Sequence, residues 1–535
     1  MKVFALHSKT QQFRITIFLA AAVAVALPAS GQITLDANFD SGSLCLIASD
    51  ACDDNGVASS VSGNIVTLIG RDNFNAGDWK WLYFRASGVA GQAVQFRIGD
   101  DFSTGGSNLN NHAMVYSYDQ ETWRFFDNNQ RQSSLVRYSF SNNAAFTQNE
   151  VYVAYGLPYP TSRVDDKVAE WAATPYVAPL TSGFGSLIIG QSPGGIDDIG
   201  RSTAGQNLYG FQITDEAYTA AKQKIVLLGG THANETVGNW TLEGLVDFLV
   251  SDDLRAAQLR QRAEFYVYPM SNPDGRYAGM NRTTVQVQNE DPNRVWDSAS
   301  NYNGQTDIRA IGQSMRFDTG GDVDYFVDFH STVNKNEAPY HFGYILGSMQ
   351  SPPFWQAVLD REPELITQGA SLIDFTGAKF GRDELGAEVS FTFETQFMPG
   401  ENTDRYQTLG ENFGLAWWDT LVNPGDLNFD GVIDTADYLI LATNAETDLD
   451  GLSPFEAYAA GDLNGDGRNS IEDFLEFKSA YIALHGPAAF AAMLQGVPEP
   501  SVYCSLSATF VLLTAAPIRK ASADPFNKTR LITGD

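Results

Sequence analysis

Three strand-like segments of this chain each lead into a side chain that can bind a metal ion or move a proton. The segments and their side chains are 225–228 with His232 and Glu235, 325–327 with His330, and 390–393 with Glu394. A continuous apolar run such as 225–228 is typical of a strand buried on both faces. Strands of this kind that alternate with helical segments indicate an α/β domain with a mainly parallel or mixed sheet. Ligands bind at the carboxyl edge of such sheets, so we expect these side chains to meet there.

Two imidazoles and one carboxylate suit a catalytic zinc ion, which keeps one position open for water. The two residues between His232 and Glu235 allow both side chains to converge on one ion, while His330 arrives from another strand. A further carboxylate beside this ion can take a proton from water, which makes Glu394 the candidate general base. Each residue alone has commoner structural roles, but the ordered set predicts a hydrolytic site with one zinc ion.

The chain of 535 residues is long enough for several domains. Short aromatic-rich runs such as 81–85 and 150–155 predict an antiparallel β-sandwich before the α/β domain. The expected divisions are a signal peptide at 1–31, a β-sandwich at 32–164, an α/β catalytic domain at 165–423, a calcium-binding repeat module at 424–485, and a linker with a C-terminal tail at 486–535.

The net charge of -30 disfavours nucleic acids and anionic membranes as partners, because a negative field repels phosphate groups. The three cysteines are too few for a disulfide framework or a cysteine-rich zinc site. Two alternatives stay open for Cys45 and Cys52: they close one short loop, or they are buried unpaired.

Five motifs in order make residues 33–423 resemble the zinc carboxypeptidase superfamily, and most of all its cytosolic carboxypeptidase-like branch. The motifs are THANE at 231–235, NPDG at 272–275, DPNR at 291–294, DFHS at 328–331 and FTFE at 391–394. The resemblance implies an N-terminal β-sandwich before the catalytic domain, which agrees with the strand-like runs. It also implies hydrolysis at the C-terminus of a peptide or protein.

The resemblance assigns roles to individual residues. It implies that His232, Glu235 and His330 are the zinc ligands and that Glu394 is the general base. Asp291 would orient a ligand histidine and fix its tautomer. Asn293 and Arg294 would hold the terminal carboxylate of the substrate, which an arginine can grip with two hydrogen bonds. Arg282 would stabilise the oxyanion, with Arg276 as the alternative.

Two features concern the substrate. Many zinc carboxypeptidases place a tyrosine before the catalytic glutamate, but no tyrosine occurs here between Tyr344 and Tyr406. Lys379 and Arg382 precede Glu394 where the family builds its side-chain pocket. Cations there would favour acidic C-terminal residues, while exposed loop charges are an equally good interpretation.

A repeated acidic motif predicts two calcium loops, since DLNFDG at 426–431 recurs as DLNGDG at 462–467. In such a loop oxygen ligands come from positions one, three, five, seven, nine and twelve, with glycine at position six. The expected side-chain ligands are Asp426, Asn428, Asp430, Asp434 and Asp437 in the first loop and Asp462, Asn464, Asp466, Ser470 and Asp473 in the second. The pair resembles a dockerin-type, EF-hand-like helical module, which implies a cohesin-like or envelope partner, or a role as a calcium-bound spacer.

Both termini predict export. Lys2, Lys9 and Arg14 precede an apolar stretch and small residues, in the order of a signal peptide, although a buried N-terminal helix is the alternative. Residues 497–501 (VPEPS), an apolar run and a basic pair resemble the PEP-CTERM sorting signal of Gram-negative surface proteins. The apolar run is short for a membrane span.

The sequence therefore favours an exported zinc metallocarboxypeptidase. One alternative is a related zinc amidohydrolase that acts on cell-wall peptides or acylated amino acids. Another is a surface protein that binds peptides without cleaving them, against which the presence of Glu394 argues.

Overall fold

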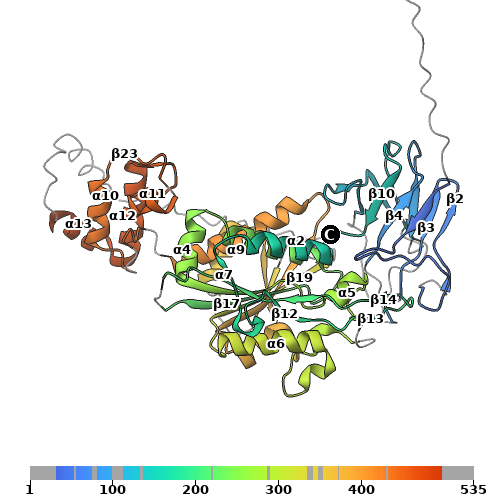
Figure 1. Cartoon of the computed structure of the whole chain (residues 1–535). Helices are drawn as coiled ribbons and strands as arrows, with labels where there is room; N and C mark the ends of the chain where they lie inside the picture. The colour runs from blue at the N-terminus through green and yellow to red at the C-terminus, as the bar shows by residue number, and fades with distance from the viewer. Residues whose placement is uncertain are drawn as a thin grey trace, which may run out of the picture.

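The computed structural model describes residues 32–496 with short gaps (Figure 1). The gaps are 53–55, 75–80, 99–112, 133–136, 219–220, 286–289, 334–341, 347–352, 371–372, 423–424, 429–431 and 453. The predicted signal peptide, the sorting signal and the calcium ligand Asp430 lie outside the described residues. Within the described residues, no helix is both long and apolar enough to cross a lipid bilayer.

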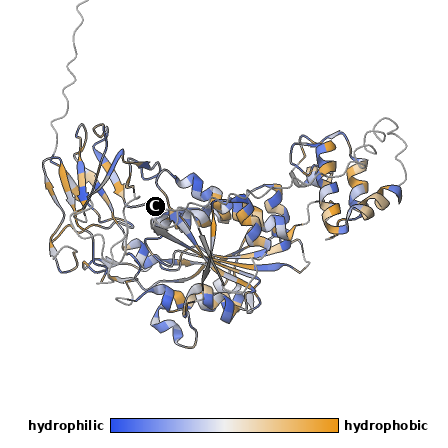
Figure 2. Ribbon diagram, turned by 180° about the vertical axis from the view of Figure 1, so that it is seen from behind, coloured by the Kyte–Doolittle hydropathy of each residue, from blue (hydrophilic) through white to orange (hydrophobic). Residues whose placement is uncertain are grey.

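The N-terminal domain consists of two five-stranded sheets with the orders β1-β4-β10-β6-β7 and β2-β3-β5-β9-β8. Their bounds are β1 Thr34–Asp36, β2 Ser60–Ser62, β3 Ile65–Leu68, β4 Tyr83–Ser87, β5 Gln95–Ile98, β6 Val115–Ser117, β7 Arg124–Phe125, β8 Asn128–Gln132, β9 Arg137–Ser141 and β10 Glu150–Ala154. Hydrophobic and hydrophilic residues alternate along these strands (Figure 2), as expected when one face of each sheet is buried.

The two sheets face each other across an aromatic core. The ring of Phe84 in β4 lies 5.8 Å from that of Phe96 in β5, and Phe140 of β9 stacks on Phe96 at 5.2 Å. The expectation of an antiparallel sandwich is wrong in one place, because β3 and β5 are parallel. The chain passes through β4 in the other sheet between them, and such a crossover returns the next strand in the same direction.

The second domain is built on an eight-stranded mixed sheet with the order β11-β16-β18-β17-β19-β22-β20-β21. Its strands are β11 Val177–Pro179, β16 Phe211–Ile213, β17 Gln223–Gly229, β18 Ala263–Tyr268, β19 Tyr325–Val333, β20 Phe342–Leu346, β21 Ile366–Ala370 and β22 Val389–Phe397. The four central strands β18, β17, β19 and β22 are parallel. The segments predicted as strands from their apolar character therefore form the middle of the sheet, where both faces are covered.

Helices cover both faces of this sheet, with α2 and α9 on one side and α6 on the other (Figure 1). The helices of the domain are α2 Thr161–Ala172, α3 Thr236–Leu249, α4 Leu254–Arg262, α5 Pro273–Tyr277, α6 Thr306–Thr319, α7 Pro353–Arg361, α8 Gly377–Leu385 and α9 Thr403–Leu421. The short 3-10 turns are η1 Thr181–Gly183, η2 Pro292–Arg294 and η3 Asn301–Gly304. Two small antiparallel sheets of two strands pair β12 Ile188–Gln191 with β15 Asn207–Tyr209 and β13 Gly195–Ile196 with β14 Ser202–Thr203. The expected boundary after residue 164 falls inside α2.

Helices α3 and α9 pack with their backbones in contact. A Cβ atom on Gly410 of α9 would lie 1.9 Å from the carbonyl oxygen of Thr241 in α3, so only glycine fits there. This close packing fixes the helix that begins directly after Glu235, and with it the direction in which the Glu235 side chain leaves the chain.

The C-terminal module contains α10 Thr435–Thr443, α11 Pro454–Ala459, α12 Ile471–His485 and α13 Pro487–Gly496, with a small β23–β24 pair at Thr447–Asp448 and Arg468–Asn469. The linker expected from residue 486 is wrong at its start, because α13 places Phe490 and Met493 in the apolar core of the module. An ion pair of 2.8 Å joins Arg262 of α4 to Asp426 of the first predicted calcium loop.

Candidate zinc centre

The candidate centre lies where β17, β19 and β22 come side by side. His232 and Glu235 follow β17, and Glu235 is the N-cap residue of α3. His330 and Glu394 are direct partners in the register of β19 and β22. The expectation that these two residues close their strands is wrong, since the parallel pairing continues to Val333 and Phe397.

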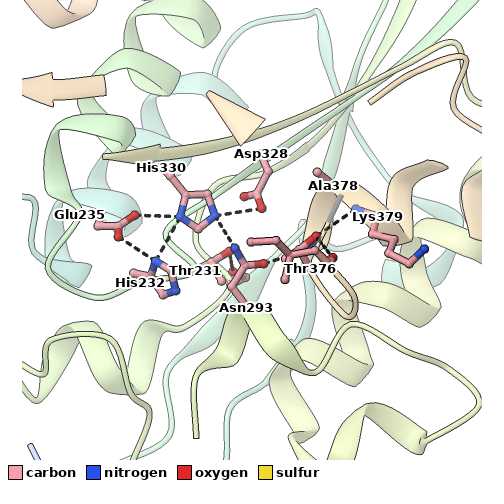
Figure 3. A network of polar contacts seen from close by, with 12 residues as sticks. Thr231, His232, Glu235, Asn293, Asp328, His330, Thr376, Ala378 and Lys379 are labelled. Atoms are coloured by element: carbon pink, nitrogen blue, oxygen red, sulfur yellow. Dashed lines mark hydrogen bonds and ion pairs between the residues drawn. The ribbon is translucent and has the colours of Figure 1, made fainter. Parts of the chain in front are cut away.

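The three predicted ligands converge on one point (Figure 3). Nδ1 of His232 lies 2.8 Å from Oε1 of Glu235, and Nδ1 of His330 lies 2.8 Å from Oε2 of the same carboxylate. The two Nδ1 atoms are 3.2 Å apart. In the part of the chain that the structure describes, these residues are the one group of three metal-type side chains whose ligand atoms meet.

The donor set fits zinc. With bonds of about 2.0–2.1 Å to a tetrahedral ion, neighbouring ligand atoms lie roughly 3.3 Å apart, close to the separation of the two imidazole nitrogens. Two nitrogen lone pairs that face each other repel unless a cation lies between them. Although burial opposes it, the two histidines hold the pKa of Glu235 well below its usual range, so this carboxylate stays ionised and able to coordinate.

Both histidines have a carboxylate on the ring nitrogen that faces away from the convergence point. Nε2 of His232 lies 2.9 Å from Oδ1 of Asp291, the contact predicted for Asp291. Nε2 of His330 lies 2.9 Å from Oδ2 of Asp328 (Figure 3), which has no exposed surface. Each carboxylate favours the tautomer that leaves Nδ1 free to bind a metal ion.

The sequence reasoning gave Asp328 no role. The sequence feature that could have identified Asp328 is the two-residue period of a strand, which puts residues 328 and 330 on the same face of β19. A Cβ atom on Gly377 would lie 2.6 Å from Oδ2 of Asp328, so the start of α8 leaves room for this carboxylate only because residue 377 is glycine.

Glu394 lies close to the ligand group without joining it. Its Oε2 atom is buried and has no hydrogen-bond partner within the described residues. Loss of hydration and the neighbouring Glu235 carboxylate raise the pKa of Glu394 to about 7. A carboxylate oxygen that carries no other hydrogen bond can accept a proton from water at neutral pH.

The structure separates the two candidate arginines. Arg282 donates from Nη1 to Oε1 of Glu235 at 3.3 Å and from Nη2 to Oδ2 of Asp291 at 3.0 Å, with its side chain 37% exposed. Arg276 is buried and donates to the carbonyl of Tyr159 and to the side chain of Asn239. Arg282 therefore presents its guanidinium to the site and to solvent, whereas Arg276 ties chain segments together.

Asn293 and Arg294 differ in their availability. The amide nitrogen of Asn293 lies 3.2 Å from Nε2 of His330, and its oxygen accepts from the backbone N–H of Gly377 at 2.9 Å (Figure 3). Arg294 is exposed and donates to the carbonyl of Asn293 at 2.7 Å. The side chain of Asn293 is thus tied to the start of α8 beside His330, while the side chain of Arg294 is exposed to solvent.

Lys379 and Arg382 lie on α8 beside the centre, and both are paired with one acid. Lys379 lies 2.8 Å from Asp383, and Arg382 lies 2.5 Å from the same carboxylate. The first tyrosine after Glu394, Tyr406, is buried in α9 and donates to the carbonyl of Gln396, so it does not cover the site.

The two predicted calcium loops share one arrangement. The buried Asp473 at position twelve of the second loop accepts backbone N–H groups from Leu463 and Asn464 through Oδ1 and from Ser470 through Oδ2. Asp437 of the first loop accepts the equivalent bonds from Leu427, Asn428 and Asp434. Both loops therefore fold around their last acidic residue.

Three family models match this chain. Residues 195–316 match the zinc carboxypeptidase model, residues 35–155 match the cytosolic carboxypeptidase N-terminal domain, and residues 424–480 match the dockerin type I domain. These matches confirm the resemblance inferred from the motifs. The first match ends before His330 and Glu394, which the tertiary structure brings to the residues inside it.

Curated relatives cover the same region. An uncharacterized protein from Zymomonas mobilis is 26% identical over 302 residues, which are 56% of this chain and 67% of the relative. Cytosolic carboxypeptidase 2 from Danio rerio is 25% identical over 325 residues, 56% of this chain and 42% of the relative. Cytosolic carboxypeptidase 6 from Homo sapiens is 27% identical over 204 residues, 37% of this chain and 39% of the relative. The chain thus spans less than half the length of the two named carboxypeptidases.

Solved structures show the same fold. A metallo-carboxypeptidase from Burkholderia cenocepacia superposes with a TM-score of 0.57 at 21% identity and covers 72% of this chain and 98% of its own. A metallo-carboxypeptidase from Pseudomonas aeruginosa, solved with (2-guanidinoethylmercapto)succinic acid, gives a TM-score of 0.53 at 20% identity, with 72% and 98% covered.

Proposed function

We propose that this chain, of which residues 195–316 match the zinc carboxypeptidase model, hydrolyses the last peptide bond of peptides or proteins. The observation that supports this most directly is the convergence of His232, Glu235 and His330 beside an oxygen of Glu394 that has no hydrogen-bond partner in the described part of the chain. The three converging residues would hold one zinc ion. Such an ion supplies a Lewis acid that polarises a carbonyl group and makes water more acidic.

The protein's own groups divide the remaining work. Oε2 of Glu394 takes a proton from the attacking water and delivers it to the leaving amine, since Glu394 is the register partner of His330 and this oxygen has no hydrogen-bond partner within the described residues. Arg282 directs its guanidinium to the oxygen of the scissile carbonyl, where negative charge grows. Asp291 and Asp328 keep the two imidazole rings in place throughout.

Recognition of a chain end is assigned to Arg294, which is exposed next to Asn293. A guanidinium can hold a terminal carboxylate through two parallel hydrogen bonds, and an amidated end offers no such partner. The preference for acidic C-terminal residues does not enter this proposal, because Asp383 already pairs with Lys379 and Arg382.

The test is a digest of a peptide library that varies the last two residues, with free and amidated C-termini, read by mass. Loss of single residues from free ends, stopped by a zinc chelator and absent with amidated ends, supports the proposal. Internal cleavage, or equal cleavage of both kinds of end, contradicts the exopeptidase activity. Release of acyl groups instead would favour the amidohydrolase alternative.

We further propose that the protein is exported and that its C-terminal module binds two calcium ions. The charge-then-apolar order of residues 1–31 supports export, as does the disulfide between Cys45 and Cys52, which resolves the choice left open by the sequence. The matched acidic loops support calcium binding. The match to a dockerin domain also supports a role for this module in binding a cohesin-like or envelope partner.

A further inference from the structure

Residues 71–74 of the N-terminal domain contact two loops at the candidate centre. One follows β17 and carries His232 and Glu235, and the other, residues 278–282, ends at Arg282. Residues 71–74 follow β3 and lie far in sequence from both loops. A small apolar cluster joins Phe74 to Ala233, Ala278, Met280 and Val285. Ala233 directly follows His232, and Met280 lies two residues before Arg282, so this segment contacts the surroundings of both.

Arg71 holds the start of the loop 278–281, which leads to Arg282. The side chain of Arg71 has no exposed surface and donates from Nη1 to the carbonyl of Ala278 at 2.6 Å. The charge of Arg71 is met by Asp197 and Asp198. The same carbonyl of Ala278 accepts a second hydrogen bond, of 2.8 Å, from Arg201.

Asn73 fixes the end of this loop. Its Oδ1 accepts the backbone N–H of Asn281 at 3.0 Å, and its Nδ2 donates to the carbonyl of Arg71 at 2.9 Å. Both asparagines are buried, with Asn73 at 1% exposure and Asn281 at 0%. The bond from Asn73 therefore ends on the residue immediately before Arg282.

The backbone of Asn73 is in the left-handed region, with φ of 49°. Its own N–H donates to Oδ2 of Asp198 at 2.9 Å, which holds this conformation. Asparagine tolerates such a backbone better than most residues, so the position carries a side-chain acceptor at a place where alanine is strained.

A guanidinium stabilises developing charge only if its position is set before the reaction, because a misplacement of about 1 Å can lower the rate roughly 10²-fold. Arg282 reaches Glu235 and Asp291 with a side chain of four rotatable bonds, so its backbone must be held for the tip to be placed. The loop 278–281 receives that restraint from residues 71 and 73.

We propose that Asn73 is a positioning residue for Arg282, so that the N-terminal domain supplies part of the geometry of the catalytic site. The inference rests on the proposed function in one respect, the action of Arg282 on the scissile carbonyl. Asn73 itself touches no reacting group.

The test compares Asn73→Gly, Arg282→Ala and the double variant of the full chain with zinc. Glycine removes the acceptor and tolerates the positive φ, so the fold is kept. We expect Asn73→Gly to lower kcat about 10- to 100-fold with KM and zinc content unchanged. In the Arg282→Ala background the same change should alter kcat less than about twofold, because coupled residues are not additive. Equal losses in both backgrounds, or an unchanged kcat, would overturn the inference.

Asn129 offers a matched control in the same domain. Its Oδ1 also accepts a backbone N–H, that of Met114, and its Nδ2 also donates to a backbone carbonyl, that of Phe126. Asn129→Ala should leave kcat within about twofold of the wild type in either background, as expected for a residue that acts on the fold alone. A kcat loss equal to that of Asn73→Gly would overturn the inference.

Hydrogen exchange of the peptide that spans 278–282 separates this inference from the proposed function. Faster exchange in Asn73→Gly, but not in Asn129→Ala, supports the restraint whether or not a substrate is found. Asn73→Asp retains the acceptor for the N–H of Asn281 but loses the donor to the carbonyl of Arg71, so its peptide should exchange more slowly than that of Asn73→Gly. Unchanged exchange in Asn73→Gly, or exchange in Asn73→Asp as fast as in Asn73→Gly, contradicts the inference, while a restrained but inactive protein contradicts only the proposed function.

Discussion

His330 and Glu394 are register partners on the neighbouring parallel strands β19 and β22. Residues paired in this way point to the same face of a sheet, with their strands about 4.8 Å apart. The sheet therefore places a candidate base beside a candidate ligand without any loop between them. A separation set by backbone hydrogen bonds varies little, which suits a site where a proton must pass between fixed positions.

Replacement of Glu394 by glutamine should retain zinc and lower kcat by about 10²- to 10⁴-fold, because the amide cannot accept the proton from water. The measurement is hydrolysis of a free-ended peptide together with elemental analysis. Glu388→Gln provides the control, since this residue is exposed just before β22 and should keep full activity. Comparable turnover in Glu394→Gln would refute the role of Glu394.

Replacement of His330 by alanine should abolish stoichiometric zinc binding, since it removes one of three converging ligands. Asp328→Asn should weaken zinc binding by about 10- to 100-fold, because the amide no longer fixes the imidazole tautomer. A competition titration with a chromophoric chelator measures both. If Asp328→Asn binds zinc as tightly as the wild type, the contact between Asp328 and His330 has no function in metal binding.

The two arginines should respond differently. Arg282→Ala should lower kcat about 10²- to 10³-fold with an unchanged melting temperature, because this side chain is partly exposed and acts on developing charge. Arg276→Ala should lower the melting temperature, because it leaves the buried carbonyl of Tyr159 and the amide of Asn239 without their donor. The opposite assignment of the two effects would return the oxyanion role to Arg276.

The metal-free protein should become less stable as pH rises, compared with Glu394→Gln. Two causes raise the pKa of Glu394 from 4.5 to about 7 in the folded protein. The larger is the loss of hydration on burial, and the smaller is the negative charge of the Glu235 carboxylate. The stabilising contribution of Glu394 is thus complete below pH 4.5 and is lost as pH rises through about 7, a difference on the order of 3 kcal/mol. Urea unfolding of both metal-free proteins from pH 4 to pH 8 measures this difference. A constant difference across this range would show that Glu394 keeps an ordinary pKa.

Calcium should raise the melting temperature of the C-terminal module, and Asp473→Ala should remove that effect for the second loop. The aspartate is buried at loop position twelve and organises the loop backbone. Glu472→Ala is the matched control, because this neighbour is exposed on the same helix. Calorimetric titration with calcium gives the number of calcium sites, which should fall from two to one only in Asp473→Ala.

Local patterns in the sequence predicted the central strands and the order of the ligands. The apolar run before His232 needs no partner to be recognised, because burial on both faces leaves a composition that few other elements share. The convergence of His232 and Glu235 was also predictable, since the spacing between them allows both side chains to reach one point. The dockerin resemblance followed from a repeat that can be read in the same way.

Long-range contacts decided the rest. The choice between Arg276 and Arg282 depended on which chain segments surround each one, and those segments come from three separate regions of the sequence. The parallel pair β3–β5, the continuation of β19 and β22 past His330 and Glu394, and the helix after residue 486 likewise depended on partners distant in the chain.

The sequence by itself determined which chemistry this protein can hold, because ligand types, their order and the strands before them are local properties. Only the tertiary structure decided how the side chains of the site are positioned and which residues hold them. It placed Asp328 beneath His330, turned Asn293 toward the same ring, and joined Asn73 of the N-terminal domain to the loop before Arg282. Such contacts leave no periodic trace, since each depends on one hydrogen bond between residues that only folding brings together.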